Sequence, residues 1–235
     1  MLCHVLADVS QHWATYLLTL SVLRWYMVMM ARNERRPGLV ELPDPTFAYL
    51  PLRDTSVPLS CLLWTSAGVF VTHWSEWENE RFCWTFILFM VFRSLVLWLH
   101  PFQGHHTQIP LRDVFIERFM GATQPMLHDA SFSGHTSMLV IMGLLMSSYR
   151  WWFWCATTLT ILLLVISRVH YLADCIIAPP IVYSLYQLAA PLADAWCHHG
   201  LLLLASAGVS WWASWLTTTD TPLSPPHTPR TPRSQ

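Results

Sequence analysis

The sequence predicts an all-α membrane protein, a polytopic helical bundle of about six transmembrane helices. Hydrophobic residues make up 54% of the 235 residues and charged residues only 11%, compared with about 25% charged residues in a typical soluble domain. Several apolar runs approach the ~20 residues with which a helix crosses a bilayer. The sequence has no strand-like alternation. Because every backbone donor must be satisfied inside a bilayer, these runs are predicted to be helices.

The N-terminal region, 1–80, is expected to contain two spans, at 13–30 and 58–74. We interpret the first as a retained span, because the start of the chain lacks the cationic region and the small-residue cleavage site of a signal peptide. The loop between the spans, 31–57, is rich in Arg and Pro. Repeated Pro argues against a regular helix in this loop.

The region 81–192 is expected to contain four spans, at 82–99, 134–149, 151–170 and 173–192. A polar, His-rich loop at 101–133 precedes the fourth span, and a turn near 152 makes the fourth and fifth spans antiparallel. The additional segment 193–216 is apolar but its run at 201–216 is short, so it could span, re-enter or lie in the interface. The Thr- and Pro-rich tail, 217–235, is expected to be disordered.

Charge and cysteine content exclude several classes of protein. The net charge is −1, and all 13 basic residues are Arg. A chain without an excess of positive charge is not expected to bind the phosphates of a nucleic acid. The six cysteines stand singly, without a Cys-x-x-Cys pair or a histidine at zinc spacing. We therefore expect neither a disulfide framework nor a metal site.

The first informative motif is the string AspAlaSerPheSerGlyHisThr at 129–136. Ser133 is a candidate helix N-cap, Gly134 permits close approach of another group, and His135 then falls in the first turn of the fourth span. A helix start of this kind offers free N–H groups and the positive end of the helix dipole, which suit a phosphate oxygen.

The second motif is SerArgValHisTyrLeuAlaAsp at 167–174. His170 and Asp174 are four residues apart and are expected to share one helical face. The carboxylate can then accept a proton from one imidazole nitrogen and leave the other free to attack. Because the turn near 152 is equidistant from His135 and His170, we expect both histidines at the same membrane depth and in one site.

The two motifs together resemble the sphingomyelin synthase branch of the type 2 phosphatidic acid phosphatase superfamily, whose members are helical membrane enzymes acting on lipid phosphate esters. The resemblance covers about 81–192. The chain departs from the pattern at Leu127-His128, where the synthases usually have Cys-Gly, and at Ser167-Arg168, which lies closer to the histidine than in the phosphatases. These departures concern the substrate more than the chemistry.

The resemblance implies a catalytic mechanism with an active site at one membrane face. A lipid phosphate is held by Arg93 and Arg168, His170 attacks phosphorus with Asp174 orienting its ring, and His135 protonates the departing oxygen. The resulting phosphohistidine is then resolved by water or by a lipid hydroxyl, and no metal or other cofactor is expected. The substrate-binding residues expected from the motifs and their surroundings are Arg93, Asp129, Ser133, Gly134, Arg168 and Tyr171.

Transfer of a phospho-headgroup from a glycerophospholipid to a ceramide-like acceptor is the function that the resemblance favours. A lipid phosphate phosphatase and a non-catalytic lipid-binding membrane protein are the alternatives. The expected partners are a phospholipid donor, a lipid acceptor and the bilayer of the Golgi, the ER or the plasma membrane. The distribution of Arg weakly favours a cytosolic active site, whereas the resemblance implies a lumenal or external one. The flanking histidines, with a substrate role as the alternative, are predicted to be polar loop residues: His100, His105, His106 and His128.

Overall fold

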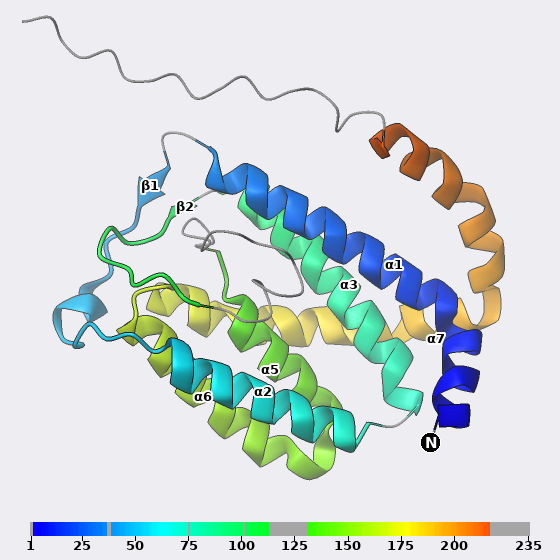
Figure 1. Ribbon diagram of the computed structural model, residues 1–235, viewed down its shortest axis with the longest axis horizontal. Coiled ribbons are helices and arrows are strands. Elements are labelled where there is room, and N and C mark those ends of the chain that lie inside the picture. Colours follow the sequence, from blue (N-terminus) through cyan, green and yellow to red (C-terminus); the bar gives the residue numbers. More distant parts are fainter. Residues whose placement is uncertain (1, 37–38, 75, 101, 113–130, 217–235) are drawn as a thin grey trace, which may run out of the picture. The chain divides into compact units, whose positions relative to one another are not determined.

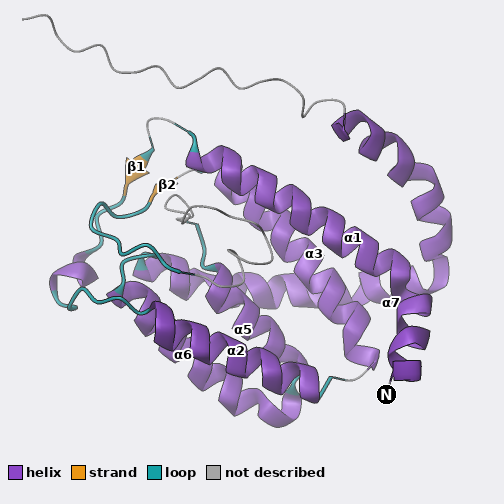
Figure 2. Ribbon diagram, viewed as in Figure 1, coloured by secondary structure: helices purple, strands orange, loops and turns teal. Residues whose placement is uncertain are grey.

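The computed structural model describes residues 2–36, 39–74, 76–100, 102–112 and 131–216 (Figure 1). The helices in chain order are α1 (Leu2–Glu34), α2 (Ser56–Thr72), α3 (Glu76–Leu99), α5 (Gly134–Leu145), α6 (Arg150–Ile166) and α7 (Leu172–Leu216). Two 3-10 turns, η1 (Pro45–Ala48) and η2 (Ser147–Tyr149), and two short strands, β1 (Val40–Glu41) and β2 (Phe102–Gln103), lie in the connections (Figure 2). The prediction of a mostly helical protein is confirmed.

Four of the described helical segments are long and apolar enough to cross a membrane. They are Trp13–Glu34, Asn79–Leu99, Ser147–Ile166 and Leu172–Asp194. The other two predicted spans form the helices α2 and α5, which have 17 and 12 residues and are shorter than a full crossing. The sequence therefore locates these helices, and four of the six expected spans are confirmed among the described residues as helices of spanning length and hydropathy.

The helices α5 and α6 form a hairpin. Gly143 of α5 lies so close to α6 that an added Cβ would be 2.8 Å from the Cβ of Phe153. Met146 leaves the helical region with a ψ of 78° and ends α5, and η2 makes the turn. The turn at 146–149 lies slightly before the predicted position.

The core lies between the helices. α1 runs beside α3, and α2 packs against both α5 and α6 (Figure 1). Phe89 of α3, Leu139 and Ile141 of α5, Phe153 of α6 and Val182 of α7 are almost fully buried in one cluster. This packing fixes the N-terminal ends of α5 and α7, which carry the two motifs.

The two loops predicted at 31–57 and 101–133 are joined by a parallel pair of strands. Val40 pairs with Phe102, and Glu41 pairs with Gln103. The chain divides by its contacts into residues 1–197 and 198–235. Both motifs belong to the first unit, and the predicted disordered tail lies outside the described residues.

Candidate active site

The two motifs meet where α5 and α7 begin. The backbone N–H of Ser133 donates to the carbonyl of Asp174 at 3.1 Å. Ser133 is also the N-cap of α5, because its hydroxyl accepts from the backbone N–H of Thr136 at 3.3 Å. The predicted N-cap is therefore confirmed, and partly buried His135 follows in the first turn of α5.

His170 and Asp174 lie side by side, as their spacing predicts. His170 Nδ1 is 3.7 Å from Asp174 Oδ2, and the His170 side chain is only 2% exposed. This distance is longer than a hydrogen bond, so the expected hydrogen bond from the imidazole to the carboxylate is not formed in this structure, and His170 Nδ1 is buried without a hydrogen-bond partner among the described residues. The same Oδ2 accepts from the backbone N–H of Tyr171 at 3.2 Å, so Asp174 is held in place by the start of its own helix.

The segment between α6 and α7 is a turn, which differs from the expected shared helical face. His170 precedes α7, which begins at Leu172. Arg168 has a φ of 58°, in the left-handed region that residues other than glycine rarely adopt. The carboxylate thus reaches the imidazole from the first turn of the helix, across this turn.

Arg93 lies behind the first motif. Its side chain is buried, its Nε donates to the carbonyl of Phe132 at 3.1 Å, and its Nη1 donates to the hydroxyl of Tyr26 at 2.5 Å. Gly134 lies directly against the guanidinium, because an added Cβ would be 2.4 Å from Nη1. A buried positive charge therefore adjoins the N-terminus of α5, which favours an anion at this place.

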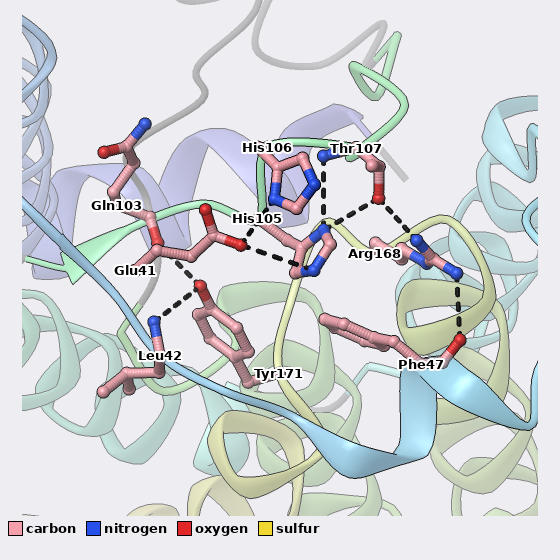
Figure 3. Close-up of polar contacts among 9 residues, drawn as sticks. All are labelled: Glu41, Leu42, Phe47, Gln103, His105, His106, Thr107, Arg168 and Tyr171. Carbon is pink, nitrogen blue, oxygen red and sulfur yellow. Dashed lines mark hydrogen bonds and ion pairs between the residues drawn. The ribbon is translucent and has the colours of Figure 1, made fainter.

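Arg168 and Tyr171 contact the loops (Figure 3). Arg168 donates to Thr107 Oγ1 at 2.5 Å and to the carbonyl of Phe47 at 2.9 Å. The Tyr171 hydroxyl donates to the carbonyl of Gln103 at 2.9 Å and accepts from the backbone N–H of Leu42 at 3.2 Å. Burial is the main cause that raises the pKa of Tyr171. In this structure both side chains tie the loops to the turn before α7.

Asp44 is a residue of the site that the sequence analysis does not identify. Its Oδ2 accepts from the backbone N–H of Leu172, the first residue of α7, at 2.8 Å. Its Oδ1 accepts from the N–H of Thr46 at 2.9 Å and caps η1. Burial acts to raise the pKa of Asp44, but the hydrogen bonds from Thr46 and Leu172 outweigh it and the pKa is lowered. The Asp-Pro-Thr string is a local signal for the cap, but not for its contact with α7.

The strand pairing brings two of the flanking histidines to one carboxylate. Glu41 Oε1 is 2.8 Å from His106 Nδ1 and 3.3 Å from His105 Nε2. The hydrogen bond from His106 is the main cause that lowers the pKa of Glu41, and burial is the main cause that lowers the pKa of His105. His128 and Asp129 lie outside the described residues.

The arrangement has the parts needed for nucleophilic chemistry on a phosphate. His170 is a buried imidazole beside a carboxylate, and a helix N-terminus with an arginine behind it lies next to the same helix start. The sequence matches no protein-family model, and no curated protein is significantly similar to it.

Proposed function

We propose that the protein is an integral membrane lipid phosphotransferase. It moves a phospho-headgroup from a glycerophospholipid to a ceramide-like acceptor, through a phosphohistidine intermediate. The observation that carries the proposal is the hydrogen bond from the N–H of Ser133 to the carbonyl of Asp174. It joins the motif that contains His135 to the motif that contains His170, as a shared catalytic site requires.

The membrane part of the proposal is supported by the helices and by their surfaces. Four described segments have the length and hydropathy of a membrane span. Large apolar side chains on these segments are more than 40% exposed, among them Leu17, Leu20, Leu159 and Ile176. Such side chains on several helices are suited to contact with lipid rather than water.

In the proposed first step, Nε2 of His170 attacks phosphorus and the bond from phosphorus to the glycerolipid oxygen breaks. Asp174 Oδ2 lies 3.7 Å from Nδ1, and its approach to hydrogen-bond distance favours the tautomer with a free Nε2 and stabilises the positive charge that develops on the ring. His135 gives a proton to the departing oxygen. Arg93 and the N-terminus of α5 stabilise the charge on the phosphoryl oxygens.

In the second step, the hydroxyl of the acceptor attacks the phosphohistidine. His135 takes the hydroxyl proton, the phosphorus–nitrogen bond breaks, and His170 is free again. With water in place of the lipid hydroxyl, the same step releases the phosphorylated headgroup of a diester donor, and it releases free phosphate when the donor is phosphatidic acid. Donor and acceptor together therefore decide between transferase and phosphatase, and the catalytic residues are the same in both.

A cavity between α5, α6 and α7 supports a lipid as the ligand. Its volume is about 610 Å³, and its lining combines apolar side chains such as Leu144 and Trp154 with the charged Arg150. This size and composition are typical of small-molecule sites. Leu144 and Arg150 lie at the α5–α6 turn, so the cavity lies toward the end of α5 opposite to the motifs and suits an acyl chain rather than the reacting phosphate.

The test is incubation of the purified protein with labelled phosphatidylcholine, phosphatidylethanolamine, phosphatidylinositol and phosphatidic acid, each with and without ceramide. We expect a labelled sphingolipid product that forms only when ceramide is present. Release of free phosphate from phosphatidic acid would instead establish the phosphatase.

The matched control is His73→Gln. His73 is an exposed histidine that contacts Tyr149 at the α5–α6 turn, at the end of α5 opposite to the motifs. This variant should keep full activity, while His170→Ala should have none. Lipid binding without turnover by the unmodified protein under every condition would favour the non-catalytic alternative and contradict the proposal.

A further inference from the structure

The loops beside the candidate active site hold a second group of ionisable side chains. It consists of Glu41 on β1 together with His105 and His106, which follow β2 (Figure 3). Parallel pairing of Glu41 with Gln103 brings the carboxylate to the histidines across more than 60 positions of sequence. The catalytic steps proposed above do not use these three residues.

The spacing of the polar atoms is close to that of a metal-ligand set. Glu41 Oε1 is 3.3 Å from His105 Nε2 and 2.8 Å from His106 Nδ1, and one ligand atom from each residue lies within 4.8 Å of the other two. In a tetrahedral zinc site with bonds of about 2.0–2.2 Å, neighbouring ligand atoms are about 3.4 Å apart. The three atoms therefore need only small movements to share one ion.

We propose that Glu41, His105 and His106 bind one divalent transition-metal ion, with Zn²⁺ as the preferred ion. Two imidazoles and one carboxylate are ligands that zinc prefers, whereas Mg²⁺ and Ca²⁺ require mostly oxygen ligands. Three protein ligands leave the fourth tetrahedral position to water or an added anion.

The environment of His105 fits a ligand whose orientation is fixed by its neighbours. Thr107 Oγ1 lies 2.8 Å from His105 Nδ1, on the side of the ring opposite to Glu41, and accepts from Arg168 Nη1. Phe47 packs edge to face on the same ring, with centroids 4.8 Å apart. In this structure His105 Nδ1 accepts from the backbone N–H of Thr107 at 3.2 Å. Binding of an ion at Nε2 puts the proton on Nδ1, which then gives up that bond and donates to Thr107 Oγ1, the usual outer-shell contact of a metal-bound histidine.

The ion can reach the group from solvent. The side chain of His106 is 68% exposed and that of Glu41 is 31% exposed, while His105 is 15% exposed. A bound ion would link the loop that contains β1 to the loop that contains β2. Both loops also contact Tyr171 and Arg168, so the ion would stabilise the layer against which the turn before α7 is packed.

The experiment uses the full chain, purified in detergent with an affinity tag that contains no histidine and freed of metal with EDTA. Titration calorimetry with Zn²⁺ should give one ion per chain, and elemental analysis after gel filtration should give the same stoichiometry. Substitution with Co²⁺ should give the visible spectrum of a tetrahedral nitrogen and oxygen site. Mg²⁺ at the same concentration should not compete.

Glu41→Gln and His106→Ala should each weaken Zn²⁺ binding at least tenfold. Both side chains are partly exposed, so the variants are expected to fold. Thr107→Val, which removes the outer-shell acceptor, should weaken binding about 10- to 100-fold. His73→Gln is the control, because it removes an exposed histidine outside the group and should leave binding unchanged.

A wild-type protein that binds less than one Zn²⁺, or variants of Glu41 and His106 that bind as the control does, would overturn the proposal. The group would then be a hydrogen-bonded network only. The experiment measures the metal directly, so its result does not depend on whether the protein transfers a lipid headgroup.

Discussion

Replacing Gly134 by Ala should destabilise the protein through Arg93. The added Cβ would lie 2.4 Å from Arg93 Nη1 and 3.1 Å from its Cζ, whereas ordinary contacts begin near 3.4 Å. The guanidinium must therefore move by about 1 Å, measured against that contact distance. It has little freedom to do so, because Nη1 donates to Tyr26 at 2.5 Å and Nε donates to Phe132 at 3.1 Å.

The expected loss of stability can be worked out from the hydrogen bond between Arg93 and Tyr26, which the movement of the guanidinium would break. A hydrogen bond to a charged group contributes about 1.5–3 kcal/mol. Against this loss, the higher helix propensity of Ala than of Gly raises the free energy of unfolding by at most about 1 kcal/mol. The free energy of unfolding should therefore fall by about 0.5–2 kcal/mol, the difference between these terms. For a chain of this size that corresponds to a fall in Tm of about 2–4 °C per kcal/mol.

Gly68→Ala is the matched control. Gly68 lies inside α2, and an added Cβ there has no atom within 4 Å. Gly68→Ala adds a Cβ to a helix without any close contact. Gly134 is the first residue of α5 and gains less helix propensity than an interior residue, so a lower Tm for Gly134→Ala reports on the contact with Arg93 and on this smaller gain. In a Tyr26→Phe background the cost of Gly134→Ala should be smaller, because the bond to Nη1 is already absent.

The assay is thermal unfolding in detergent, followed by the fluorescence of the 14 Trp residues. We expect Gly134→Ala to melt below the wild type and Gly68→Ala to melt at or above it. Equal Tm values for the two variants would show that the guanidinium does not lie against the start of α5. The interpretation of Arg93 as the buried cation of the site would then be wrong.

The remaining predictions concern the catalytic groups and the loop that supports them. His170→Ala and His135→Ala should each abolish headgroup transfer without affecting membrane insertion, measured with labelled lipid; more than a few per cent of activity in either would contradict the assigned roles. Asp174→Asn should lower kcat by several orders of magnitude with little change in KM, because the amide favours the wrong tautomer of the imidazole; a near wild-type kcat would require another orienting group. Asp44→Asn should lower the free energy of unfolding by about 1–3 kcal/mol, since one of its two acceptor oxygens becomes a donor. Because the pKa of Asp44 is lowered in the folded state, its contribution is complete above the ordinary Asp value of 3.8 and is lost as the pH falls through the folded value. The Tm values of wild type and Asp44→Asn should therefore converge in acid, and a constant difference down to the lowest pH would contradict this.

Several features of this protein follow from local sequence alone. The apolar runs predict where helices form, because a helix satisfies its own backbone within one segment. The cap formed by Ser133 joins two residues that are three positions apart. His170 and Asp174, which lie close together, are four positions apart. Short separations of this kind leave few possible geometries.

The lengths of the helices were less well determined by the sequence. The run at 134–149 is apolar throughout, yet α5 ends at Leu145 because Met146 leaves the helical region and η2 follows. Apolar composition indicates burial, either in lipid or in protein, and does not set the residue at which a turn begins. The close approach of Gly143 to Phe153 is a property of the packed hairpin.

The long-range contacts of the site were decided by the tertiary structure. Asp44 caps α7 from 128 positions away, Tyr171 reaches Leu42 across 129, and Arg168 reaches Phe47 across 121. No periodicity or spacing encodes these pairs, because they depend on where two Pro- and His-containing loops fold back over the helix ends. The sequence by itself determined the helical segments and the chemistry of the two motifs. Only packing of the loops decided that Arg168 and Tyr171 face the loops, and that Glu41 lies beside His105 and His106.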